Sequence, residues 1–263
     1  MGTNQTQGGA AIAVADGGRA DLSPPPTRLS RPALFLDLDG VLAPLVATPD
    51  AVVPDARRTA VLRALSDRLG NRVAIVSGRT IAEIDRIAED STLSASGVHG
   101  LERRRADGTM ERTGPAAEVR SVVAAFEDFA RHRPGMIVED KAVSAGLHYR
   151  GAPDHGDGAL SLAHSLAEET GLALQAGHLV VELKTPGTDK GTSLTAFMSE
   201  APFAGGCPIM VGDDLTDEDG FRAAEALGGF GVLVGPRRDT AARYGLADVD
   251  AVLTWLDAIE DMS

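Results

Sequence analysis

Three short apolar runs, each ending in acidic or small polar residues, constrain the fold of this chain most. They are Ala33–Leu36 before Asp37-Leu38-Asp39-Gly40, Val73–Val76 before Ser77-Gly78-Arg79, and Pro208–Val211 before Gly212-Asp213-Asp214. Such runs are typical of strands that are buried on both faces of a parallel sheet. Functional residues of these sheets gather beyond the carboxyl ends of the strands, so we expect the three polar ends to meet at one edge.

Helical patterns separate these strands, which is the alternation of an α/β protein. The expected helices are Asp55–Leu69, Ile81–Glu89, Thr192–Met198, Asp217–Ala226 and Val252–Ile259. A third strand and its exit loop are expected at Ser94–Gly100, and a further strand at Phe230–Val234.

The middle of the chain follows a different pattern. Two helices, Val119–Phe129 and Leu160–Glu169, each precede a pair of strand-like runs. These runs are Met136–Lys141, Ala145–Arg150, Leu172–Gln175 and Leu179–Lys184. The order α-β-β-α-β-β indicates an antiparallel sheet with helices on one face. We therefore predict an α/β fold: a Rossmann-like parallel-sheet hydrolase core at 31–112 and 187–263, with an inserted α+β cap domain at 113–186.

Composition limits the compartment and the partners. Residues 1–30 are rich in Gly, Ala, Ser and Pro, so we expect a disordered tail, and no signal peptide is recognisable there. The single cysteine, Cys207, allows no intrachain disulfide, which fits a reducing compartment, and we expect a cytoplasmic protein. The net charge of −13 argues against nucleic acid and membranes as partners. We expect a monomer that binds a small molecule.

Asp37 and Asp39 are the first candidates for chemistry. On a strand end, residues two apart place their side chains on the same side. One carboxylate could attack phosphorus as a nucleophile, and the other could exchange protons with the leaving group and with water. Asp-x-Asp-Gly alone fits a simple turn equally well.

The other polar ends add phosphate-binding and metal-binding groups. The Ser77 hydroxyl and its neighbouring N–H groups could bind a phosphate oxygen, although a helix N-cap is the simpler explanation. Lys190 opens a helix and could place a charge on phosphate. The segment 213–219 contains five acids in seven residues, a set of hard oxygen ligands that suits magnesium.

Taken in order, these pieces resemble the four motifs of the haloacid dehalogenase superfamily of phosphatases. The resemblance implies that Asp37 is the nucleophile and that Asp39 is the general acid and base. It further implies that Ser77, Gly78 and Lys190 bind the phosphoryl group.

The same resemblance implies a cofactor, Mg²⁺. Its ligands would be Asp37, the carbonyl of Asp39, and Asp213. Asp214 and Asp217 would support the site.

Within the superfamily, roughly residues 33–260 look like trehalose-6-phosphate phosphatases. The segments that carry this resemblance are Asp37–Pro44, Gly97–Gly100, Glu139–Lys141 with Ser144, His148–Arg150, Val181–Lys184 and Gly212–Asp219. The cap residues alternate onto one strand face in pairs of charged side chains, which could bind sugar hydroxyls. The solvated face of a half-exposed sheet would explain any one pair. The expected substrate-binding residues are Arg79, His99, Glu139, Lys141, Arg150, His178, Glu182 and Lys184.

Two positions depart from the family. Val41 stands where threonine is usual, and His178 stands where a cap lysine is usual. A histidine there would make hydroxyl contact weaker or pH-dependent.

The resemblance implies hydrolysis of trehalose 6-phosphate to trehalose and phosphate, the last step of trehalose biosynthesis. Three alternatives stay open at this point. One is a phosphatase for another sugar phosphate, such as sucrose 6-phosphate. Another is a hexose-phosphate mutase on the same core, and the third is a sugar-phosphate sensor without turnover.

Overall fold

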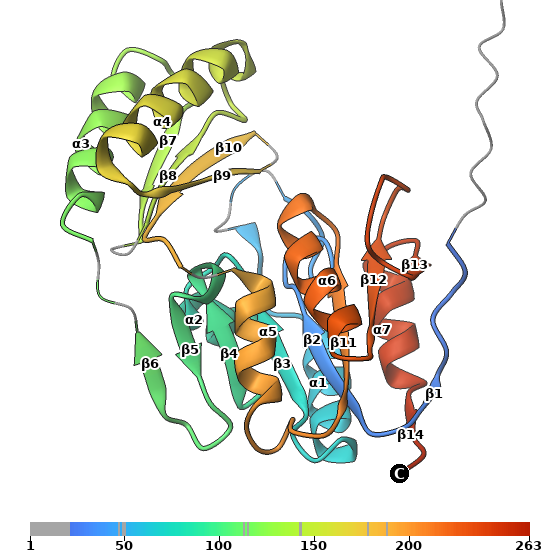
Figure 1. The fold of residues 1–263 in the computed structure, drawn as a ribbon. Coiled ribbons are helices and arrows are strands. Elements are labelled where there is room, and N and C mark those ends of the chain that lie inside the picture. The colour runs from blue at the N-terminus through green and yellow to red at the C-terminus, as the bar shows by residue number, and fades with distance from the viewer. Residues whose placement is uncertain are drawn as a thin grey trace, which may run out of the picture.

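The computed structural model describes residues 22–263, apart from positions 47, 49, 50, 113, 115, 142, 143, 178 and 188. A large and a small sheet make up most of the fold, and the small one stands over one end of the large one (Figure 1). The chain builds part of the large sheet, crosses to the small sheet and then returns. The α/β class with a parallel core and an inserted α+β unit is therefore confirmed.

The large sheet has eight strands in the order β13-β12-β11-β2-β3-β4-β5-β6. Six strands are parallel, and β5 and β6 form an antiparallel hairpin at one edge. Their bounds are β2 Pro32–Leu36, β3 Val73–Val76, β4 Ser94–Gly97, β5 Glu102–Arg104, β6 Met110–Arg112, β11 Cys207–Gly212, β12 Phe230–Val234 and β13 Tyr244–Leu246. The first and third apolar runs pair directly, since Leu36 of β2 lies opposite Val211 of β11.

Helices cover both faces of this sheet because side chains alternate along each strand. Leu34 and Leu36 of β2 enter one hydrophobic core, whereas Ala33 and Phe35 enter the other. The helices of the first core are α1 (Ala56–Arg68), α2 (Ile81–Ala88) and α7 (Val249–Asp257), and those of the second are α5 (Lys190–Met198) and α6 (Glu218–Ala226). None of the helices in the described part of the chain is both long and apolar enough to span a membrane.

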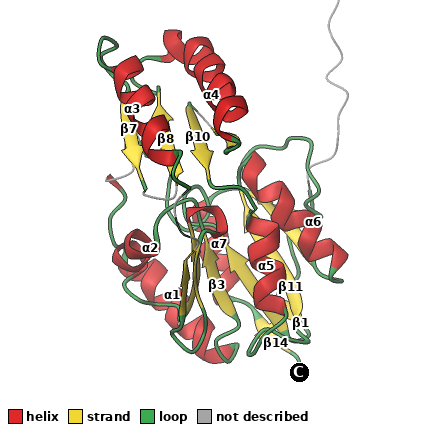
Figure 2. Cartoon of the chain, turned by 60° about the vertical axis from the view of Figure 1, so that its left-hand side comes forward, coloured by secondary structure: helices red, strands yellow, loops and turns green. Residues whose placement is uncertain are grey.

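The small sheet is antiparallel, with the order β7-β8-β10-β9. Its strands are β7 Ile137–Asp140, β8 Ser144–His148, β9 Ala173–Gly177 and β10 Val180–Lys184. Helices α3 (Val119–Ala130) and α4 (Gly156–Thr170) pack on one face through Phe126, Ala159 and Ala163 (Figure 2). This unit is the predicted cap, and its other face carries the charged residues of the site. The exact boundaries at 112/113 and 186/187 stay a prediction.

Some elements differ from expectation. Helix α4 begins at Gly156, not at Leu160, because a short turn at Pro153–His155 leads straight into it. The β5–β6 hairpin and β13 have only three residues per strand, too few for a periodic pattern to identify them.

The expected disorder of residues 1–30 is wrong for residues 22–30, and residues 1–21 lie outside the described part. Arg28–Leu29 form β1, which pairs in parallel with β14 at Glu260–Asp261. Leu29 is buried in the first core, and the indole N–H of Trp255 donates to the Pro26 carbonyl at 3.1 Å. Pairing with the far end of the chain orders a segment whose composition alone indicates disorder.

Removal of residues 1–30 is therefore expected to destabilise the protein more than removal of residues 1–21. Loss of the buried Leu29 side chain alone would cost about 1.5–3 kcal/mol, which corresponds to a melting temperature lower by roughly 3–12 °C. Thermal unfolding of the two truncated proteins checks this expectation. Equal melting temperatures would show that β1 contributes nothing to stability.

Candidate active site

Asp37 and Lys190 form a buried ion pair where β2 ends and α5 begins. Lys190 Nζ lies 3.0 Å from Asp37 Oδ2 and 2.6 Å from Asp217 Oδ1. Asp37 is 6% exposed and Lys190 only 2%, so Lys190 is no ordinary surface lysine. Burial would lower the pKa of Lys190, but the Asp217 and Asp37 carboxylates outweigh burial and raise that pKa. Lys190 is thus a permanent positive charge beside the predicted nucleophile.

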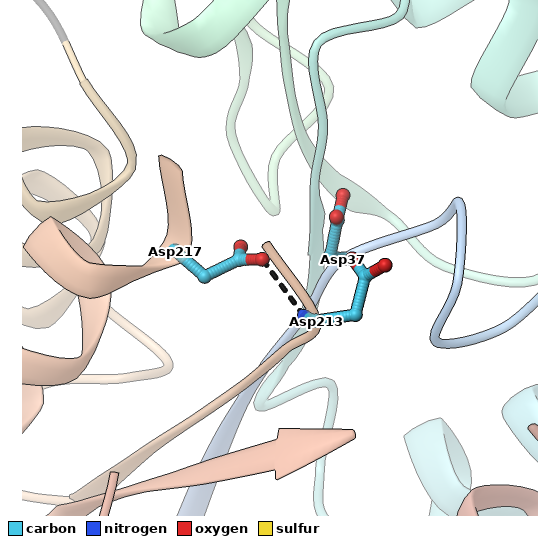
Figure 3. A group of neighbouring side chains, drawn as sticks. All are labelled: Asp37, Asp213 and Asp217. Atoms are coloured by element: carbon cyan, nitrogen blue, oxygen red, sulfur yellow. Dashed lines mark hydrogen bonds between the residues drawn. The ribbon is translucent and has the colours of Figure 1, made fainter. Parts of the chain in front are cut away.

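Three carboxylates, those of Asp37, Asp213 and Asp217, converge at this edge of the sheet (Figure 3). Each offers an oxygen, and these oxygens all lie within 4.8 Å of one another. Burial, reinforced by Asp217 and Asp214, raises the pKa of Asp213 to about 7. Burial likewise raises the pKa of Asp37, against the effect of Lys190. A hard cation would relieve this crowding, and an all-oxygen donor set suits Mg²⁺.

The backbone conformation around the three carboxylates allows them to lie close together. Asp217 Oδ2 accepts hydrogen bonds from the N–H groups of Asp213 at 2.9 Å and Asp214 at 3.1 Å, which closes the loop after β11. Gly40 has φ +76°, and a Cβ there would lie 2.1 Å from Asp213 Oδ2. Only glycine allows the first motif to approach the Asp213 carboxylate this closely.

Asp39 is separated from this group by its own partner. Arg79 binds both of its carboxylate oxygens, with Nε 2.7 Å from Oδ2 and Nη2 2.8 Å from Oδ1. Burial would lower the pKa of Arg79, but the hydrogen bonds to Asp39 raise it. The strand ends at Leu36, so the expected alternation does not extend to Asp39, and the two carboxylates face different cations. An acid role for Asp39 requires Arg79 to release it.

Ser77 is 1% exposed directly after β3, and its hydroxyl accepts a hydrogen bond from Arg79 N–H at 3.2 Å. The simpler explanation of Ser77 as a helix cap is wrong, because Thr80 caps α2 with Glu83 in a capping box. Gly78 leaves room for the imidazole ring of His99, because a Cβ at position 78 would lie 2.5 Å from His99 Nε2.

A cavity of about 520 Å³ separates these core residues from the cap. Six of the predicted substrate-binding residues line it: Arg79, His99, Glu139, Lys141, Arg150 and Glu182. Asp39 and Asp214 line it as well. Groups from both sheets thus meet around one space large enough for a small sugar phosphate.

Glu182 is the centre of the cap side of this cavity. It is 7% exposed and accepts a hydrogen bond from the Ser144 hydroxyl at 2.5 Å. Lys141 Nζ lies 3.7 Å away, and His99 Nε2 lies 3.4 Å away. Burial would raise the pKa of Glu182, but Lys141 and His99 outweigh burial and hold it well below its usual range. Glu182 is therefore an ionised, largely buried acceptor at the wall of the cavity.

Lys141 and Glu139 complete this face. Lys141 Nζ donates to the Gly78 carbonyl at 3.0 Å, a direct bond between cap and core, and lies 3.5 Å from Glu139 Oε2. Glu139 Oε2 is also 2.9 Å from His148 Nε2. These contacts keep acceptors and donors fixed before any ligand binds.

His99 belongs to the core but is held against the cap. Val98 and His99 have φ of 47° and 51°, a left-handed conformation that is unusual for a β-branched residue such as Val98. Burial lowers the pKa of His99, so the ring is neutral at pH 7. Gln175 Nε2 lies 2.9 Å from His99 Nε2.

The lining of the cavity differs in part from the predicted set of substrate residues. Lys184 lines a neighbouring cavity, and His178 lies outside the described residues. Gln175 and Glu83 line the main cavity without having been predicted. Gln175 lies opposite Glu182 in the β9–β10 register, a pairing that no local pattern reveals.

Comparison with known proteins supports a single family. The family profile described as trehalose-phosphatase matches residues 35–250. A trehalose-6-phosphate phosphatase of Escherichia coli (strain K12) is 38% identical over 240 residues, which cover 90% of each chain. A solved trehalose-6-phosphate phosphatase related protein is 25% identical with a TM-score of 0.69, over 85% of this chain and 94% of that one. The C-terminal domain of the Candida albicans trehalose-6-phosphate phosphatase shares the fold, with a TM-score of 0.79 at 24% identity over 87% of this chain and 92% of that one.

Proposed function

The chain belongs to the trehalose-phosphatase family of phosphoric monoester hydrolases, and we propose that it releases inorganic phosphate from trehalose 6-phosphate. This would be the last step of trehalose biosynthesis. The observation that carries the proposal is the Asp37–Lys190 ion pair, set beside Asp213 and near a cavity that Glu182 lines from the cap side. A buried nucleophile with a fixed cation is what phosphoryl transfer requires.

The first step forms a bond between Asp37 and phosphorus. Asp37 attacks the phosphoryl group, the bond from phosphorus to the sugar oxygen breaks, and Asp39 gives a proton to that oxygen. Lys190 stabilises the negative charge of the transferred group. Arg79 binds Asp39 as a carboxylate, so Arg79 must first leave and Asp39 must take up a proton from solvent before it can act as the acid.

The second step returns the enzyme to its starting state. Asp39 takes a proton from water, the water oxygen bonds to phosphorus, and the aspartyl-phosphate bond breaks. Mg²⁺ held by Asp37, Asp213 and the Asp39 carbonyl would supply charge neutralisation for the phosphoryl oxygens. Asp217 fits a supporting role, because Lys190 and two loop N–H groups already occupy its oxygens.

The substrate assignment is tested by phosphate release from trehalose 6-phosphate, glucose 6-phosphate and sucrose 6-phosphate, each with and without Mg²⁺. Trehalose 6-phosphate should give the highest kcat/KM because its distal glucose reaches the cap residues. Higher kcat/KM with sucrose 6-phosphate would assign a different sugar. Binding without phosphate release would indicate a sensor.

Metal removal is expected to stop catalysis and to lower stability. Asp37 and Asp217 are buried and Asp213 is half-buried, and their oxygens lie within 4.8 Å of one another, so the single charge of Lys190 offsets only part of their mutual repulsion. EDTA should abolish phosphate release, and added Mg²⁺ should restore it and raise the melting temperature. In an Asp213→Asn variant, the rise in melting temperature with Mg²⁺ should become smaller. Full activity in excess chelator would contradict the proposed metal.

A further inference from the structure

Lys184 lies at the end of β10 in a different environment from the other cap residues. It is 5% exposed and lines a second cavity of about 550 Å³. His99 and Gln175 line both cavities, so their contact stands between them. Lys184 thus faces a space next to the 520 Å³ cavity, called the sugar cavity below, and close to Gly187 and Asp189, which lead into α5.

The Lys184 ammonium has no hydrogen-bond or ion-pair partner among the residues that the structure describes. The two acids that line the same cavity are engaged elsewhere. Asp189 Oδ1 accepts from Thr192 N–H at 2.7 Å as the cap of α5, and Asp219 Oδ1 pairs with Arg222 at 3.0 Å. The Lys184 side chain is largely buried while its ammonium is open to this cavity, where a bound anion would give it a charge partner.

Other groups around the cavity are consistent with an anion. Lys190 lines it too, and the same ammonium touches Asp37, so the cavity leads toward the predicted phosphoryl position. Burial lowers the pKa of Lys184, against the effect of Glu182, Asp189 and Asp219. Glu182 itself is already bound by Lys141, Ser144 and His99.

We propose that Lys184 and the cavity it lines form an oxyanion site that takes inorganic phosphate, separate from the sugar cavity. The choice of phosphate among oxyanions rests on the proposed phosphatase function, because phosphate is the product released beside Lys190. Phosphate would leave on the Lys184 side of the His99–Gln175 contact while trehalose leaves on the other.

Isothermal titration of the full chain with inorganic phosphate, in chloride buffer with EDTA, tests this site. Without a divalent cation, the Asp37, Asp213 and Asp217 carboxylates repel phosphate from the catalytic site, whereas the Lys184 site needs no metal. The wild-type protein should bind one phosphate. Lys184→Met, which keeps an unbranched side chain one atom shorter and removes the charge, should weaken binding about tenfold or more.

Arg131→Met is the control for loss of one positive charge from the cap, since Arg131 is exposed at the end of α3 and pairs with Asp128. Its phosphate binding should equal that of the wild type, and Lys184→Arg should retain binding. Absence of phosphate binding by the wild-type protein in EDTA would overturn the proposal, whether or not Lys184→Met folds. Equal binding by wild type and a folded Lys184→Met would overturn it as well. Neither result depends on a sugar phosphate, so failure of the substrate assignment would be seen separately.

Discussion

Replacement of Asp37 by asparagine should abolish phosphate release and leave the fold intact. The amide keeps the shape of the side chain and can still accept the hydrogen bond that Leu38 N–H donates to Oδ1 at 2.7 Å. It has no carboxylate to form the phosphoryl bond, so kcat should fall by roughly 10⁴-fold or more. Lys190 keeps Asp217 as a partner, and the burial of Lys190 therefore costs little more than before. Steady-state kinetics and thermal unfolding measure the two effects.

The same substitution should not lower the melting temperature in EDTA. Burial raises the pKa of Asp37 in the folded state, so at neutral pH its ionisation opposes folding. An uncharged amide removes this cost, and the variant should be as stable as the wild type or more stable. Asp250→Asn, which changes an exposed acid on α7, is the control for loss of one charge and should retain activity. Near wild-type turnover by a folded Asp37→Asn protein would exclude the covalent mechanism.

Truncation of Glu182 or Glu139 to alanine should reduce turnover of trehalose 6-phosphate far more than turnover of p-nitrophenyl phosphate. Both carboxylates line the cavity on the cap side, away from the Asp37–Lys190 pair. We expect them to contact the distal sugar and not a small activated ester. Each lost hydrogen bond to a charged acceptor is worth about 1.5–3 kcal/mol, or roughly one to two powers of ten in kcat/KM.

The ratio of kcat/KM for the two substrates separates binding from folding effects. Glu168→Ala, which removes an exposed carboxylate on the far helix of the cap, should change neither value. Equal losses on both substrates would show that the glutamates act through the packing of the cap or through core chemistry. No loss of kcat/KM with either substrate would mean that the charged cap face does not bind the sugar.

Features that depend on residues close together along the chain were predictable from the sequence. The apolar runs at Val73–Val76 and Phe230–Val234 form β3 and β12 with those bounds, because burial on both faces leaves a continuous apolar signature. Asp37 and Asp213 lie at one edge of the sheet because parallel strands bring their carboxyl ends together. The α-β-β-α-β-β order likewise predicted the antiparallel cap sheet.

Which charged side chains pair with one another was decided only by the tertiary structure. Spacing placed Asp39 beside Asp37, yet Arg79 binds it, while Asp217 joins Asp37 at the carboxylate cluster. Alternation grouped Lys184 with Glu182, yet the two residues line different cavities.

The N-terminal segment is a similar case. Composition indicated a disordered tail, yet residues 28–29 pair with a strand near the opposite end of the chain. The physical reason is the same in each case. Periodicity along the chain records which face of an element is buried, whereas the contacts of a charged or unpaired group depend on elements distant in sequence that meet only when the chain folds.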